Sequence, residues 1–147
     1  MSRLIRSCLV LVLALGPLTG CRSFHREWRA VRARAVPADQ ITGAWEGTWQ
    51  SRAGSHTDRM RAVVSSTGPE TYRVHYYAWY KRVLTFSYVA ELRAIRREGG
   101  TVIFSGEADL GWLAGGLYRY EGHASPLEFF SSYDSKYEIG TFTLKRP

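Results

Sequence analysis

The chain has 147 residues, a formal net charge of +7 and two cysteines. A positive excess of this size would fit a nucleic-acid-binding protein, but most of it lies in the first 40 residues. From residue 41 to the end there are 13 basic and 11 acidic side chains, so nucleic acid is not expected as a partner.

The first 20 residues have the layout of an export signal. Arg3 and Arg6 precede the apolar run of residues 8–15, and Gly16-Pro17 follows it. The run is well short of the roughly 20 residues that cross a bilayer as a helix, and the proline would interrupt such a helix. We therefore expect residues 1–20 to be a signal peptide that is removed after export.

The signal ends in Leu18-Thr19-Gly20-Cys21, which resembles the lipobox of bacterial lipoprotein precursors. The resemblance implies cleavage before Cys21 and attachment of a diacylglyceryl group to its sulfur. An ordinary secretory signal with a chance cysteine is the alternative. In the family an acidic residue after the cysteine can retain the protein at the inner membrane. Arg22 stands there in this chain, so the resemblance favours a lipid-anchored envelope protein facing the periplasm, at the outer membrane.

Lipidation would also remove thiol chemistry from the mature protein. Cys8 leaves with the signal, and acylated Cys21 is no longer a free thiol. A disulfide, a thiolate metal site and a cysteine nucleophile are then excluded. Two or three acyl chains hold a protein at a membrane, because each buried methylene contributes about 0.8 kcal/mol.

Residues 21–40 are expected to be a basic tether between the lipid and the main domain. Residues 22–40 contain five arginines and two acidic side chains, and basic residues near anionic head groups contribute on the order of 1 kcal/mol each. Apolar residues recur at helical spacing: Phe24, Trp28, Val31 and Ala35. A short helix could lie on the membrane with this face inward. A disordered, solvated spacer is the alternative.

Residues 41–147 have a period-two hydrophobic pattern with turn residues at regular intervals. We expect strands at about 41–50, 57–65, 71–80, 83–95, 101–109, 116–123, 127–133 and 139–146, although residues 88–97 also fit a helix. Short connections predict an all-β, antiparallel up-and-down barrel or half-open barrel. A two-sheet sandwich is the alternative.

The alternation also separates an apolar inner side from a polar outer side. The inner side includes Trp45, Trp49, Met60, Tyr72, Val74, Tyr76, Tyr80, Leu84, Phe86, Tyr88, Val102 and Phe104. The outer side includes Arg59, Arg61, Arg73, His75, Glu91, Arg93, Glu107 and Asp109. The inner side is expected to form the core.

The first strand contains Gly43-Ala44-Trp45, which resembles the opening glycine, any residue, tryptophan of the calycin barrels, the group of lipocalins, fatty-acid-binding proteins and avidins. In lipocalins this tryptophan packs across the closed end of the barrel under an arginine from near the chain's end. The resemblance therefore implies that Gly43, Trp45 and Arg146 close the barrel. A tryptophan in an ordinary β-core is the alternative, and Gly47-Thr48-Trp49 repeats the spacing.

No pattern typical of catalysis or metal binding is present. The four histidines, His25, His56, His75 and His123, lack the spacing of a metal site, and no serine lies in a nucleophile elbow. We expect no catalytic residues, no metal and no cofactor. An envelope hydrolase, the remote alternative, would need His75 or His123 to be joined to a carboxylate in a cleft.

The chain is rich in aromatic residues, with nine tyrosines, six phenylalanines and five tryptophans. Inward tyrosines need partners for their hydroxyls, which indicates either a polar network or an interior wide enough to hold water or a ligand. The expected lining residues are Tyr72, Tyr76, Phe86, Tyr88, Phe104, Tyr118 and Tyr120. A filled aromatic core is the alternative.

The glycine-rich segment 109–116 is expected to expose Trp112 and Leu113 as a lid or a contact loop. These features together predict a non-catalytic envelope protein, anchored through Cys21 and the basic tether, that binds a small apolar or amphipathic ligand. A structural or adaptor lipoprotein in an envelope protein complex is the alternative.

Overall fold

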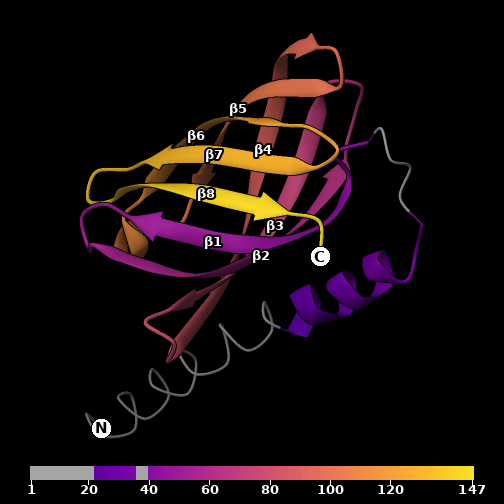
Figure 1. Cartoon of the computed structure of the whole chain (residues 1–147). Coiled ribbons are helices and arrows are strands. Elements are labelled where there is room, and N and C mark those ends of the chain that lie inside the picture. The colour runs from indigo at the N-terminus through magenta and orange to yellow at the C-terminus, as the bar shows by residue number, and fades with distance from the viewer. Residues whose placement is uncertain (1–21, 36–39) are drawn as a thin grey trace, which may run out of the picture.

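The computed structural model describes residues 22–35 and 40–147 (Figure 1). A short helix covers residues 22–32. The strands are β1 (Gly43–Ser51), β2 (His56–Ser66), β3 (Thr71–Tyr80), β4 (Leu84–Glu98), β5 (Thr101–Asp109), β6 (Leu117–Ala124), β7 (Glu128–Asp134) and β8 (Ile139–Lys145), with a 3-10 turn, η1 (Trp112–Ala114), between β5 and β6. The predicted signal peptide, residues 1–20, and Cys21 lie outside the described residues. Within the described ranges, no helix is long and apolar enough to span a membrane.

The eight strands form a closed antiparallel barrel in which each strand pairs with the next and β8 pairs with β1. The predicted up-and-down barrel is confirmed, and the sandwich alternative is wrong. The predicted strand bounds agree with the observed ones to within about three residues. Residues 88–97 belong to β4, whose neighbours β3 and β5 supply the ladder hydrogen bonds that a helix would forgo.

Connections in an up-and-down barrel alternate between its two ends. The chain enters β1 at one end, which we call the closed end because Trp45 and Arg146 fill it. The connections after β1, β3, β5 and β7 lie at the other end, which we call the open end.

At the closed end, Trp45 is fully buried, and the guanidinium carbon of Arg146 lies 4.0 Å from the centroid of its ring. Arg146 Nη1 donates to the carbonyl of Thr42 at 2.9 Å, and its Nε donates to the carbonyl of Pro126 at 3.2 Å. Gly43 has φ 114°, a left-handed conformation that strains any residue with a Cβ. Arg146 therefore covers Trp45 at this end of the barrel.

The period-two pattern gives the correct inner face over most of the barrel. Tyr76, Phe104 and Val74 are at most 1% exposed. Leu84 and Phe86 differ, since they are 61% and 38% exposed although they share the inward parity. They lie near the open end of the β3–β4 hairpin, which projects away from the other strands, so fewer neighbours cover them (Figure 1).

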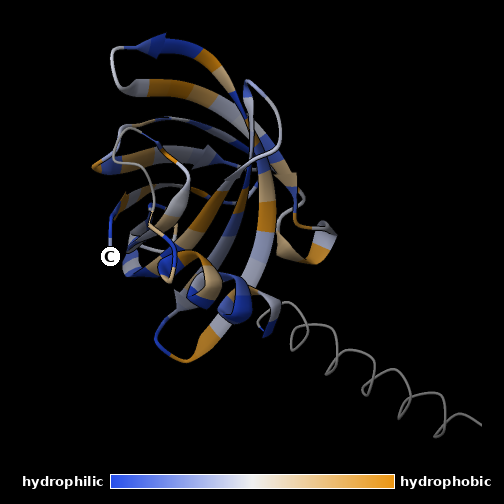
Figure 2. Cartoon of the chain, turned by 90° about the vertical axis from the view of Figure 1, so that its right-hand side faces the viewer, coloured by the Kyte–Doolittle hydropathy of each residue, from blue (hydrophilic) through white to orange (hydrophobic). Residues whose placement is uncertain are grey.

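The N-terminal helix packs against the outside of the barrel (Figure 2). Phe24 and Trp28 are 0% and 5% exposed and lie in one apolar cluster with Ala44, Val63 and Tyr77. Full burial of a large apolar side chain contributes about 1.5–3 kcal/mol. The apolar face expected for a membrane therefore contacts the barrel instead. The described part of the tether is also not a disordered spacer, because residues 22–32 form this docked helix.

Candidate functional site

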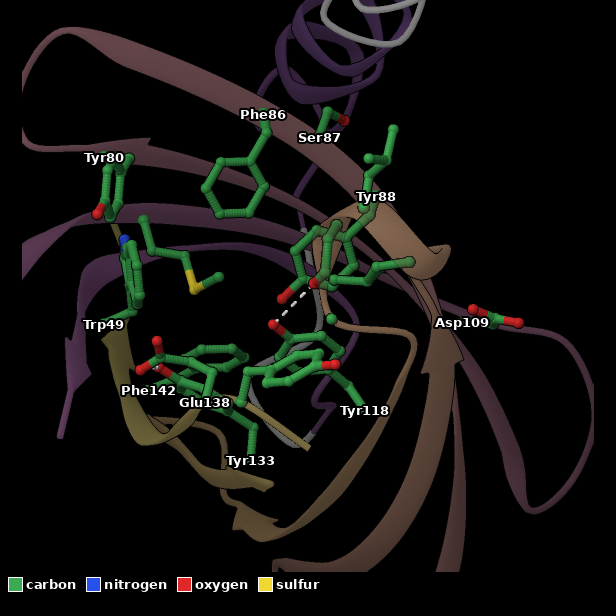
Figure 3. A pocket seen from close by; sticks show the side chains of 16 residues that line it. Trp49, Tyr80, Phe86, Ser87, Tyr88, Asp109, Tyr118, Tyr133, Glu138 and Phe142 are labelled. Atoms are coloured by element: carbon green, nitrogen blue, oxygen red, sulfur yellow. Dashed lines mark hydrogen bonds between the residues drawn. The ribbon is translucent and has the colours of Figure 1, made fainter. Parts of the chain in front are cut away.

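The open end of the barrel holds a cavity of about 830 Å³ (Figure 3). Its lining is mostly aromatic and aliphatic and comes from strands on all sides and from the η1 loop. The lining residues are Trp49, Met60, Tyr80, Phe86, Ser87, Tyr88, Asp109, Leu110, Leu113, Ala114, Gly115, Tyr118, Tyr133, Tyr137, Glu138 and Phe142. This volume lies within the range of about 300–1,000 Å³ that is typical of small-molecule sites.

The cavity exists because the aromatic layers fill only part of the barrel. At the closed end, Phe129 packs between Trp45 and Phe104, with ring centroids 5.9 and 5.1 Å away. Above them, the Tyr76 ring lies 5.3 Å from that of Phe142 and forms the next buried layer. Phe142 borders the cavity, so the empty space begins above this second layer.

Two buried hydroxyls beneath the cavity have no hydrogen-bond partner among the described residues, those of Tyr76 and Tyr120. Each such group costs about 1–3 kcal/mol unless a water molecule or a ligand satisfies it. Both rings contact Phe142, with centroid distances of 5.3 and 6.0 Å. These two unpaired hydroxyls therefore belong to side chains that pack directly beneath Phe142, a residue that lines the cavity.

The polar groups in the cavity wall are mainly acceptors and hydroxyls. The Glu138 carboxylate accepts hydrogen bonds from Ser51 Oγ and, at 3.5 Å, from the hydroxyl of Tyr133. Burial, together with the negative charge of Glu138, raises the pKa of Tyr133 above its ordinary value. Asp109 is a second acidic lining residue, and none of the lining residues is basic.

The barrel wall is incomplete beside the cavity. Residues 84–90 of β4 pair with β3, and the described pairing of β4 with β5 begins only at Glu91. Phe86 and Tyr88 lie on one side of this gap, and Leu110 and Leu113 lie on the other, and all four line the cavity. The cavity is therefore bordered laterally by an unpaired strand edge and the η1 loop.

Three of the seven predicted lining residues border the cavity: Phe86, Tyr88 and Tyr118. The other four, Tyr72, Tyr76, Phe104 and Tyr120, are buried nearer the closed end or in the layer beneath the cavity. Sequence parity identified the inward side but not the depth along the axis. It also missed Trp49, Met60, Tyr133 and Phe142 as lining residues, although their inward parity was the available signal.

The η1 loop lies at the mouth of the cavity. Trp112 and Leu113 are 84% and 76% exposed, and Leu113 also lines the cavity. The loop turns at Gly111 and Gly115, with φ values of 79° and 101°. Asp109 Oδ1 accepts a hydrogen bond from the backbone of Gly111 at 2.9 Å. The structure thus exposes both residues that were expected in a lid or contact loop.

A second polar cluster lies outside the barrel, under the N-terminal helix. His75 is 4% exposed although its parity is outward, because the helix covers it. Its Nδ1 lies 2.6 Å from Glu27 Oε2, and its Nε2 lies 2.7 Å from Ser87 Oγ. A carboxylate only accepts, so Nδ1 is the donor to Glu27. Arg73 Nη1 donates to the other oxygen of this carboxylate at 2.9 Å.

The burial of His75 differs from the prediction, because the strand alternation placed His75 on the outer side, in contact with water. An available signal was the run of apolar residues on the outer side, Ala44, Val63 and Tyr77, which predicts that something covers this part of the barrel.

No protein-family model matches the chain, and no curated protein matches it in sequence. A function for this chain therefore has to be inferred from the barrel, its cavity and the chemistry of the lining residues.

Proposed function

We propose that this protein is a lipid-anchored envelope protein whose barrel binds a small apolar or amphipathic molecule in the cavity at its open end. The observation that carries the proposal is the aromatic-lined cavity of about 830 Å³. An adaptor with a filled core would not need such a space. Anchoring through Cys21 is part of the proposal and rests on the lipobox resemblance.

The lining narrows the chemical class of the ligand. Glu138 and Asp109 border the cavity, and no lining residue is basic. A free carboxylate inside would be repelled by these side chains and would find no positive charge to offset its lost hydration. A neutral ligand that donates a hydrogen bond would instead find the Glu138 carboxylate. We therefore expect an uncharged amphipathic molecule, such as one with an alcohol group, to bind better than the fatty acid of equal length.

Two probes test this preference. The purified full chain is titrated with dodecanol and with dodecanoate, and binding is followed by the fluorescence of Trp49, which lines the cavity. The Trp49→Phe variant shows how much of the fluorescence change on binding comes from Trp49. Native mass spectrometry of the chain purified without denaturation shows whether a small molecule is already bound. Equal affinity for both probes would refute the expected preference for an uncharged ligand. If neither probe binds and the native mass is ligand-free, the proposal that the barrel binds a small molecule is refuted.

A cavity-filling variant supplies the control. Ala114→Trp adds a large side chain at the cavity mouth, whereas Ala30→Trp adds the same group at an exposed position of the helix. We expect the first variant to lose most of the dodecanol binding and the second to keep it.

The cluster of Ser87, His75 and Glu27 supports a second candidate function, an envelope hydrolase. Its distances of 2.7 and 2.6 Å lie within the range of a nucleophile, base and orienting acid. Ser87 Oγ would attack an ester carbonyl while its proton passes to His75 Nε2, and His75 would return that proton to the departing alkoxide. Water would then hydrolyse the acyl-serine.

A fluorophosphonate probe, which reacts with activated serines, tests the hydrolase. Labelling at Ser87 that His75→Ala abolishes would support it. Thr85→Ala, which removes an exposed hydroxyl on the same strand, should change nothing. Without labelling, the cluster is a polar contact that holds the helix on the barrel.

A further inference from the structure

Exposed large apolar side chains gather at the open end of the barrel. Of the eleven that the described residues leave exposed, eight lie near the open-end turn of the β3–β4 hairpin, around η1 or at the β7–β8 connection. They are Val83, Leu84, Phe86, Trp112, Leu113, Leu117, Tyr137 and Ile139. The other three are Val89, which pairs with His75 in the middle of the β3–β4 ladder, Ile95 and Leu127. A grouped apolar surface of this kind marks a contact with a partner or a membrane.

The positive charge of the connections is also unequal between the two ends. The open-end connections carry four basic side chains, Arg52, Lys81, Arg82 and Lys136, and one acidic side chain, Glu138. The connections at the closed end, after β2, β4 and β6, carry Glu70 as their charged residue. Basic residues beside exposed apolar ones are typical of a surface that meets anionic lipid head groups.

The N-terminal helix starts toward this same end. His25 contacts Tyr77, with ring centroids 4.7 Å apart, whereas Glu27 contacts Arg73, four residues nearer the closed end. The helix therefore runs from the open end toward the closed end. Figures 1 and 2 show its start and the β3–β4 hairpin on the same side of the barrel, at the bottom in both views. Arg22, its first described residue, directly follows Cys21.

We propose that the open end is a membrane-docking face. The tip of the β3–β4 hairpin, residues 81–84, and η1 rest among the head groups of an anionic bilayer, with Lys81 and Arg82 at the phosphates and Val83, Leu84, Trp112 and Leu113 in the interface. The gap between β4 and η1 then faces the bilayer. Provided that the cavity binds a ligand as proposed above, this gap is the route by which the ligand passes between bilayer and barrel.

Trp112 is a natural reporter of this docking. The full chain is reconstituted into vesicles of phosphatidylglycerol and phosphatidylethanolamine whose acyl chains carry bromine, which quenches nearby tryptophan. The difference between the wild-type protein and Trp112→Phe isolates the signal of Trp112. We expect bromine to quench most of that signal. An unquenched Trp112 signal would overturn the proposal and would point to a protein partner for this surface.

A reporter at the opposite end provides the matched control. Leu127 is 79% exposed and lies in the β6–β7 connection at the closed end. In the Trp112→Phe background, Leu127→Trp should add a signal that bromine does not quench. Equal quenching of Trp112 and of this tryptophan would mean that the barrel has no fixed orientation, which refutes docking.

The role of charge is tested with brominated phosphatidylcholine alone. We expect a clear loss of Trp112 quenching there, and the same loss for Lys81→Gln/Arg82→Gln on anionic vesicles. Unchanged quenching in both arms would refute the anionic part of the proposal. Failure of docking is distinct from failure of the carrier, because dodecanol binding is measured without vesicles.

Discussion

Arg146 covers Trp45 at the closed end of the barrel, with its guanidinium carbon 4.0 Å from the ring centroid. The two residues belong to the last and the first segments of the domain, and the contact joins them beside the β1–β8 pairing that closes the sheet. Arg146 also donates to the carbonyls of Thr42 and Pro126. One side chain therefore ties three backbone segments together.

Arg146→Ala should destabilise the barrel by about 2–4 kcal/mol, because it removes charge-assisted hydrogen bonds worth about 1.5–3 kcal/mol and a cation–π contact. Urea unfolding followed by tryptophan fluorescence measures the loss. Arg119→Ala is the control, because Arg119 is exposed and its ion pair with Glu107 is 3.7 Å long. Similar losses of stability in both variants would show that the contact of Arg146 with Trp45 contributes no more than an exposed ion pair.

Gly43→Ala should cost about 1–2 kcal/mol in the free energy of unfolding, because φ at this position is 114°. Gly100→Ala is the matched control, because a Cβ there would have Pro126 Cδ as its nearest neighbour, at an ordinary contact distance of 3.7 Å. Equal stability of the two variants in thermal unfolding would mean that Gly43 is not held in the left-handed conformation.

Phe24→Ala should release the N-terminal helix while the barrel stays folded. Phe24 is fully buried, and its ring packs against Tyr77 and His75 at centroid distances of 5.1 Å. Truncation of a buried Phe costs about 3–5 kcal/mol, more than a short helix retains from its other contacts. Amide hydrogen exchange should accelerate in residues 22–32 and stay slow in β5 and β6. Arg29→Ala, at an exposed helix position, should leave the exchange unchanged.

The tyrosines of the interior should make the barrel sensitive to alkali. Burial raises the pKa values of Tyr76, Tyr88, Tyr120 and Tyr133 above the ordinary 10.0. Below pH 10 these tyrosines are neutral in both states, so their contribution to stability is fully present. As the pH rises above 10, the unfolded chain releases protons that the folded barrel retains, and stability is lost.

Absorbance at 295 nm, which reports tyrosinate, checks this prediction alongside circular dichroism. These four tyrosines should ionise only together with unfolding. Ionisation of all the tyrosines near pH 10 before any loss of β-structure would contradict it.

Much of the fold was predictable because strand parity and turn residues are local features. Trp45, Tyr76 and Phe104 were assigned inward from their alternation alone, and they are buried. The depth of a residue along the barrel depends instead on the end at which its strand begins and on how neighbouring strands are staggered. Tyr72 and Phe86 have the same parity, yet Tyr72 is buried near the closed end and Phe86 borders the cavity.

The partner of an amphipathic helix is likewise not encoded in its own periodicity. Phe24 and Trp28 define an apolar face that would suit a bilayer or a protein equally well. Its actual partner is set by Val63 and Tyr77, which are apolar residues on the outer side of the barrel. The burial of His75 follows from the same contact, and it could not be predicted from the sequence for the same reason.

The docked helix determines how freely the protein can move on a membrane. Residue 22 already belongs to the helix, and the helix is fixed to the barrel by Phe24, Trp28 and the ion pairs of Glu27. If the neighbouring Cys21 carries the lipid, the barrel is held at the membrane through a helix that is fixed to it, and not through a flexible linker. Its tilt and its height above the head groups would be set by the fold, and lateral diffusion would carry its cavity along the bilayer at constant depth.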